Sequence, residues 1–129
     1  MADEDANELL SFYITTAADI ESESALIINA AVSDFGMERE GSLQFLNENF
    51  TQRDRKDMLY YLGLINDGLK GELARVRKRR NELAHTNQHN IIEDIGRVQN
   101  SIKRAKGAKD KLKSIGIEVE KRKTGFQEE

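Results

Sequence analysis

The expected fold depends on residues 60–85, which read YYLGLINDGLKGELARVRKRRNELAH. Asn66-Asp67-Gly68 is a turn signal, and a helix is predicted to begin at Asp67 or Gly68 and to end near His85. Its apolar positions alternate in steps of four and three residues, which places them on one side: Leu69, Leu73, Val76 and Leu83. The missing member of this series is Arg80. An arginine on a buried stripe is costly unless it is paired or opens onto a cavity or an interface.

Apolar residues at three-to-four spacing predict further helices on both sides of this segment. They cover residues 6–35, 52–65 and 89–114, and a short helical piece is predicted at 42–50. No strand pattern is visible, so the expected fold is all-α: a four-helix up-and-down bundle with a short extra helical turn. We expect one domain over residues 1–117 and a solvated, flexible, charged tail over residues 118–129.

The two helices before the central segment have an expected buried side. In the first helix it comprises Leu10, Tyr13, Ala17, Ile20, Ser24, Ile28, Ala31 and Phe35, and in the helix at 52–65 it comprises Met58, Tyr61, Leu62 and Ile65. The first helix also carries an acidic patch of Asp19, Glu21 and Glu23. This patch is expected either to be solvated or to pair with arginines of the following helices.

Composition limits the class of protein. The 129 residues include no cysteine and no proline, so a disulfide framework and a thiolate metal site are excluded and long helices are permitted. The longest apolar run is far short of the roughly 18 residues that a membrane span needs, and the N-terminal stretch MADEDANELL is acidic where a signal peptide would be basic. We therefore expect a soluble, cytoplasmic protein.

The charge is distributed unevenly along the chain. Residues 1–50 carry eleven acidic residues and one base, a net charge of −10, whereas residues 51–129 carry nineteen bases and twelve acids, a net charge of +7. Such polarity is typical of proteins with a basic face for a polyanion or an acidic partner. Alternatively, the acidic and basic helices neutralise each other within the fold or between two subunits.

Arg80, Asn81 and His85 form the candidate catalytic group. On one helix, Arg80 and His85 are separated by about 140° and roughly 7.5 Å, so a composite site between two copies of the chain is favoured. Asn81 and His85 share a face, so the amide could fix the imidazole tautomer. An arginine can hold a phosphate while a histidine transfers protons, which suffices for metal-independent RNA cleavage by the 2′-hydroxyl. The structural alternative pairs Arg80 with the acidic first helix and makes His85 a helix cap.

The segment RKRRNELAH resembles the Arg-x(4–6)-His motif of HEPN domains (higher eukaryotes and prokaryotes nucleotide-binding), in its common form Arg-Asn-x-x-Ala-His. The matching positions are Arg80, Asn81, Ala84 and His85. With ESESALIINAAV in the first helix, residues 7–100 look more narrowly similar to the mannitol operon repressor-type branch, although Ser24 stands where that branch leads us to expect an arginine.

This resemblance implies a helical bundle that forms a homodimer through the motif helices. It implies a metal-independent endoribonuclease, often a toxin or defence effector with an antitoxin or regulatory protein partner. Arg80 would bind the scissile phosphate, Asn81 would position it or orient His85, and His85 would be the general acid–base. The alternative is a non-catalytic HEPN-like regulatory or interaction domain that binds a protein or nucleic acid.

Two further hypotheses concern the binding of a polyanion and of a metal ion. The cluster of Arg75, Arg77, Lys78 and Arg79 is the candidate surface for RNA or another polyanion, or is simply a solvated basic face. His85 and His89 are four residues apart, and Glu82 or Glu93 could complete a metal site with them. The intervening Thr86-Asn87-Gln88 reads as a helix break, so we expect neither a metal nor another cofactor.

Overall fold

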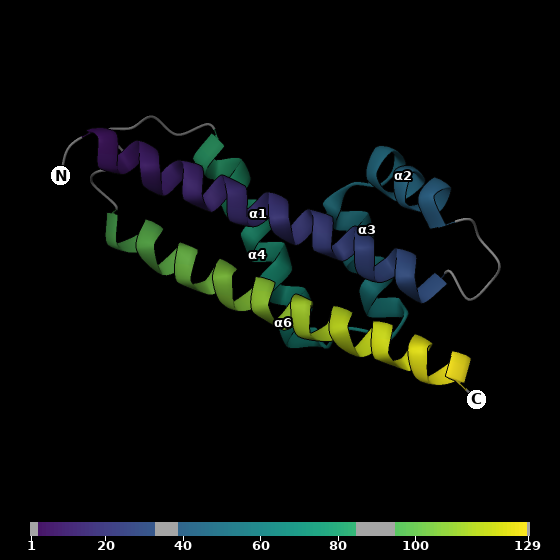
Figure 1. The fold of residues 1–129 in the computed structure, drawn as a ribbon. Coiled ribbons are helices and arrows are strands. Elements are labelled where there is room, and N and C mark those ends of the chain that lie inside the picture. Colours follow the sequence, from purple (N-terminus) through teal and green to yellow (C-terminus); the bar gives the residue numbers. More distant parts are fainter. Residues whose placement is uncertain (1–2, 33–38, 85–94, 129) are drawn as a thin grey trace.

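The computed structural model describes residues 3–32, 39–84 and 95–128, and these residues form five α-helices and no strand (Figure 1). The helices are α1 (Asp3–Val32), α2 (Arg39–Asn49), α3 (Gln52–Tyr61), α4 (Asp67–Ala84) and α6 (Ile95–Glu128). The expected all-α class is confirmed, whereas the expected four-helix up-and-down bundle is not. Within the described ranges, no helix is both long enough and apolar enough to cross a membrane.

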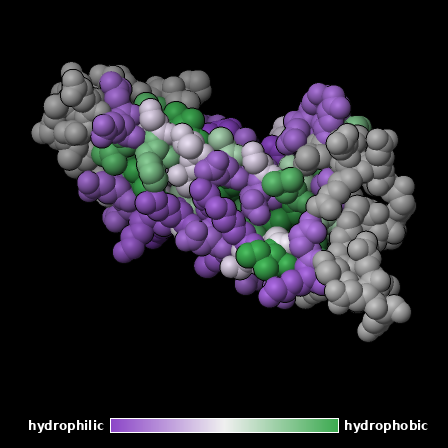
Figure 2. Space-filling model, viewed as in Figure 1, coloured by the Kyte–Doolittle hydropathy of each residue, from purple (hydrophilic) through white to green (hydrophobic). Residues whose placement is uncertain are grey.

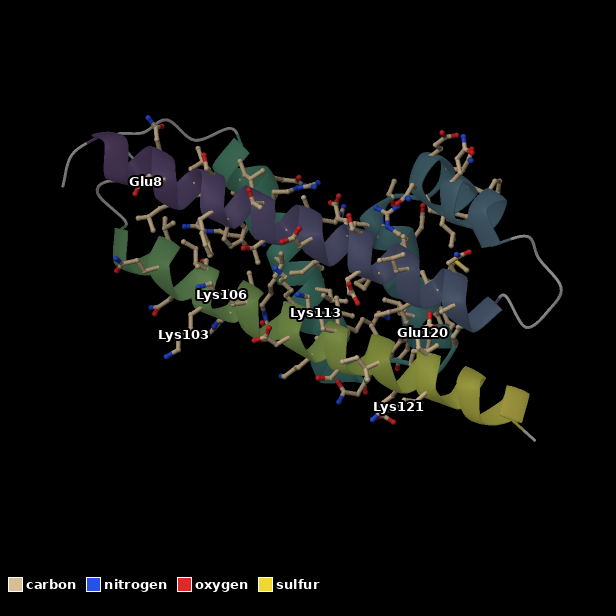
Figure 3. All side chains as sticks on the ribbon, in the orientation of Figure 1. Glu8, Lys103, Lys106, Lys113, Glu120 and Lys121 are labelled. Carbon is tan, nitrogen blue, oxygen red and sulfur yellow. The ribbon has the colours of Figure 1, made fainter. Side chains whose placement is uncertain are left out.

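The two longest helices, α1 and α6, run side by side in the same direction (Figure 1). Three contacts keep a nearly constant offset along them: Phe12 lies under the Nζ of Lys106, Asp19 accepts a 2.9 Å hydrogen bond from Lys109, and Glu23 lies beside Gly116. In Figure 3, Lys106 projects from the side of α6 that faces α1. A constant offset identifies a parallel pair, and α4 crosses both helices.

The predicted stripe of α1 is confirmed where the structure describes it. Tyr13, Ala17, Ile20, Ser24 and Ile28 are buried, and Leu10 and Ala31 are half-buried. Phe35 lies outside the described residues. On the face seen in Figure 2, hydrophobic residues form separate small areas between hydrophilic ones, which agrees with an apolar core closed between the helices.

The central helix α4 covers the predicted segment, but the expected cap at Asp67 or Gly68 is wrong. Asn66 is the cap, because its Oδ1 accepts a 2.8 Å hydrogen bond from the backbone N–H of Leu69. The four stripe residues are all buried: Leu69, Leu73, Val76 and Leu83. The hydroxyl of Tyr13 donates a 3.2 Å hydrogen bond to the carbonyl of Val76, which ties α1 to the middle of α4.

The helix predicted over residues 52–65 is shorter than expected. A capping box starts α3, with Thr51 and Asp54 each accepting from the other's backbone N–H, but the helix ends at Tyr61. Gly63 then takes a positive φ of 75°, which a glycine adopts without strain, and turns the chain. The expected buried side is wrong in part, because Leu59 is fully buried whereas Tyr61 is 80% exposed.

The last helix is longer than expected. The end predicted near residue 114 is wrong, since α6 continues to Glu128 and includes residues that the sequence assigned to a solvated tail. The reason is a stripe at a spacing of three and four residues that persists past Gly107, and that comprises the buried Ala105, Ala108, Leu112 and Val119 and the half-buried Ile115. Burial against the other helices outweighs the weak helix propensity of the glycine.

A buried arginine joins α2 to α3. Arg55 is only 6% exposed, and its Nη1 donates hydrogen bonds of 2.9 Å to the carbonyl of Leu46 and 2.6 Å to that of Phe50. Its Nε donates to Gln52 at 3.1 Å, and Gln52 donates in turn to the buried hydroxyl of Ser24 at 3.2 Å. Burial lowers the pKa of Arg55 below its ordinary value, and the nearby Glu21 carboxylate opposes that shift.

Candidate polyanion-binding site

One face of α4 lines a pocket. Glu72, Arg75, Val76, Arg79 and Glu82 each lie three or four residues from another member of this set, so they project from the same side of the helix, and Lys78 stands next to them. The pocket has a volume of about 240 Å³. Three of the four residues predicted to bind a polyanion, Arg75, Lys78 and Arg79, are therefore brought together around it, whereas Arg77 is not.

Two other helices complete this pocket. α6 contributes Ser101 and Arg104, one helical turn apart, and α1 contributes Tyr13. Ser101 donates a 2.9 Å hydrogen bond to the carbonyl of Arg97 within its own helix. The pocket thus presents cationic side chains from two helices, because Arg104 belongs to α6 and Lys78 to α4.

The pocket also contains its own carboxylates. Glu72 accepts a 2.6 Å hydrogen bond from Arg75, and Glu82 accepts one of 3.1 Å from Arg79. The side chains are partly open to solvent, from 27% for Glu72 and Arg79 to 64% for Arg75. With four cations and two carboxylates, the pocket residues carry a net charge of +2. Such solvent-screened pairs exchange partners readily.

The buried wall of the pocket is a neutral tyrosine. Tyr13 is 1% exposed, and burial raises its pKa to about 12, with the Arg79 charge opposing and the Glu82 charge reinforcing the shift. At neutral pH its hydroxyl therefore keeps its proton and its bond to the Val76 carbonyl. An anion in the pocket would face no negative charge from this side.

Arg80 lies on a different face of α4 from the pocket. Its Nη1 donates to Glu21 of α1 in an ion pair whose two side chains are about one-third exposed or less. This contact is the pairing with the acidic first helix that the structural alternative predicts. Asp19 of the same acidic patch pairs with Lys109, so the patch serves at least in part as a partner for basic helices.

Asn81 is exposed and lies next to Arg80, with its Oδ1 3.4 Å from the Nη2 of the arginine. His85, His89 and Glu93 lie outside the described residues, so the catalytic pairing with His85 stays a prediction. The described residues contain no group of three or more His, Cys, Asp or Glu side chains placed to hold a metal ion.

Sequence reasoning missed the contributions of Tyr13, Ser101 and Arg104. These residues lie far from α4 in the chain, and no local pattern connects them to it.

Ser24 stands where the repressor-type branch leads us to expect an arginine. It is fully buried and accepts a hydrogen bond from Gln52, so the larger side chain has no room there. Comparison with protein-family models, curated proteins and solved structures finds no match for this chain.

Proposed function

We propose that this chain is an RNA-binding domain that contacts the phosphate backbone through the basic face of α4 and α6. The observation that carries the proposal is the pocket at which Arg75, Lys78, Arg79 and Arg104 converge from two helices. Lysine and arginine side chains bind phosphates by releasing the counterions that surround a nucleic acid. The resemblance of Arg80, Asn81, Ala84 and His85 to the HEPN motif favours RNA over other polyanions.

The test measures binding of a fluorescein-labelled, single-stranded RNA by fluorescence anisotropy at several salt concentrations. Alanine at Lys78 or Arg104 is expected to weaken binding. It should also reduce the slope of the logarithm of the binding constant against the logarithm of salt concentration by about 0.7 in magnitude for each phosphate that the variant no longer neutralises. Alanine at Arg53, which is exposed on α3 and does not line the pocket, is the control with the same change of charge. Equal effects of all three substitutions would refute a specific surface.

A second candidate function is metal-independent endoribonuclease activity in a HEPN-like homodimer. The observation that favours it is the contact between Arg80 and the exposed Asn81 near the end of α4, since both belong to the motif that His85 completes in the sequence. Glu21 fixes the guanidinium of Arg80 but also occupies it, so a scissile phosphate would have to displace this carboxylate. A protein partner, such as an antitoxin or a regulator, would then control an active dimer; without cleavage, the same fold would act as a regulatory domain.

Cleavage is tested by incubating the protein with mixed RNA in EDTA, beside Arg80→Ala and His85→Ala variants. Products with 2′,3′-cyclic phosphate ends that vanish in both variants would establish the nuclease and both residues. Glu21→Gln is the informative third variant, because it frees Arg80 without removing it, and we expect it to cleave at least as fast as the unmodified chain. If a folded dimer leaves RNA intact, the cleavage proposal fails and the binding proposal is unaffected.

A further inference from the structure

We infer that the pocket between α1, α4 and α6 is a discrete site for one phosphate group, and that Glu72 and Glu82 compete with the phosphate for the pocket arginines. This inference deepens the proposed function and rests on it for the RNA source of the phosphate. The phosphate could also come from a free phosphate or phosphorylated small molecule, and the experiment below separates the two sources.

Lys78 and Arg104 are the primary ligands of the site. They line the pocket from two helices, Lys78 from α4 and Arg104 from α6, and neither side chain forms an ion pair or hydrogen bond with another residue of the described ranges. A phosphate between them would accept hydrogen bonds from both helices. Arg104 would donate from its planar guanidinium, and Lys78 would donate from its compact ammonium group. Clamping from two helices distinguishes this site from a row of cations along one solvated face.

Arg75 and Arg79 are the secondary ligands, and each is held by a glutamate of its own helix. Both pairs join residues three apart, at 2.6 Å for Arg75 with Glu72 and 3.1 Å for Arg79 with Glu82. A phosphate carries as much charge as a carboxylate or more, and it offers more acceptor oxygens. Binding would therefore transfer the guanidinium groups from the carboxylates to the phosphate, and the carboxylates would set the affinity.

The dimensions and lining suit a phosphate with part of its attached group. The volume of about 240 Å³ leaves room for a phosphate together with part of its attached group. Val76 and the neutral Tyr13 supply an uncharged inner wall. Among the residues that line the pocket, no aromatic ring stands exposed for a base to stack upon, since Tyr13 is buried. The site therefore selects the phosphate and not the base.

The chain offers a matched control for the competing carboxylates. Glu118 and Lys121 form another pair of residues three apart on α6, at 3.7 Å, and neither lines the pocket. Glu118→Gln changes the net charge of the protein by the same amount as Glu72→Gln or Glu82→Gln. Any effect of overall charge alone would therefore appear equally in all three variants.

The experiment titrates inorganic phosphate and, separately, a ten-residue uridine oligonucleotide into the ¹⁵N-labelled full chain and follows amide shifts by NMR. We expect saturable phosphate binding, with affinity raised about threefold or more by Glu72→Gln or Glu82→Gln. Glu118→Gln is expected to leave the affinity unchanged within about 1.5-fold, whereas Lys78→Ala and Arg104→Ala lower it at least fivefold in a chain whose other amide shifts are intact. These magnitudes follow from one charge at contact distance in a solvent-screened site.

Each outcome decides a different claim. If phosphate does not saturate the pocket in any glutamine variant, or if Glu118→Gln acts as strongly as the pocket variants, the discrete site is refuted. If the oligonucleotide still binds through α4 in that case, the proposed function survives without the site. If phosphate binds as expected but the oligonucleotide binds no more tightly than phosphate, the site stands with a small phosphorylated ligand and the RNA proposal fails.

Discussion

Replacing Arg55 gives the sharpest test of how the fold is held together. Its guanidinium reaches the carbonyls of Leu46 and Phe50 where α2 ends, and helix ends leave such acceptors without partners of their own. It also bonds to Gln52, which links it to Ser24 on α1. Arg55→Ala removes all three donated bonds and leaves a space in the core, so it should weaken the attachment of α2 as well as the whole fold.

The size of the effect follows from these bonds. A hydrogen bond from a charged donor contributes roughly 1.5–3 kcal/mol, but bonds from one side chain are not additive and water can reach part of the vacated space. We expect Arg55→Ala to cost about 3 kcal/mol, a large share of the roughly 5–15 kcal/mol by which domains are usually stable. For a chain of this size that corresponds to a Tm lower by about 10 °C. Arg55→Lys keeps the positive charge but not the planar guanidinium with its several donors, and should lower the free energy of unfolding by about 1.5–2 kcal/mol.

Urea unfolding followed by circular dichroism at 222 nm measures these free energies, with Arg53→Ala as the control. Arg53 is exposed on the same helix, and its replacement should change the free energy of unfolding by less than about 0.5 kcal/mol. Hydrogen exchange should show that the amides of α2 lose protection first in Arg55→Ala. If Arg55→Ala and Arg53→Ala unfold at the same urea concentration, the reasoning about the buried network is refuted.

Three further changes test other elements. Gly107→Ala should raise the free energy of unfolding by about 0.5–1 kcal/mol, because the added Cβ meets nothing within 4 Å. Gly116→Ala should raise it by less, because its Cβ would lie 3.0 Å from the Glu23 carboxylate. Equal shifts of Tm in the two variants would contradict this account. The pKa of Tyr13 is raised from its ordinary value of 10 to about 12, so the contribution of Tyr13 to stability is complete below pH 10 and is lost as the pH rises toward 12. In denaturation measured at several pH values, Tyr13→Phe should therefore lose less stability at alkaline pH than the unmodified chain. Hydrogen bonds from Thr51 lower the pKa of Asp54 below its ordinary value of 3.8. The contribution of Asp54 to stability is therefore complete above pH 3.8 and is lost as the pH falls through the lower pKa of the folded state. Asp54→Asn should remove that part of the acid dependence of stability, and an unchanged pH profile would count against the capping box.

The central helix and the first helix were predictable because their buried residues repeat at helical spacing over several turns. Tyr13 to Ile28 forms one continuous stripe, and Leu69 to Leu83 forms another that only Arg80 interrupts, so local pattern alone determines which side is buried. The end of α3 was not predictable in the same way. Its apolar residues continue past Tyr61, and only the turn at Gly63 decides which of them face outward.

The candidate site was predictable only in its α4 half. Arg75, Lys78 and Arg79 form a visible cluster in the sequence, but Arg104 belongs to a lysine-rich stretch in which no residue stands out. Its importance comes from packing α6 against α4, which is a tertiary property. Arg80 shows the opposite case: its place in the apolar series correctly indicated an unusual arginine, and the structure supplies Glu21 as the partner that such a position requires.

The parallel pairing of α1 with α6 has a consequence for how the chain is made. Asp19 and Lys109 are 90 residues apart, so a ribosome adding about 5–20 residues per second adds Asp19 roughly 5–18 s before the lysine of α6 that pairs with it. During that interval the apolar side of α1 has only the shorter helices to pack against. The nascent chain that most needs protection from aggregation is therefore the one in which α4 has emerged and α6 has not.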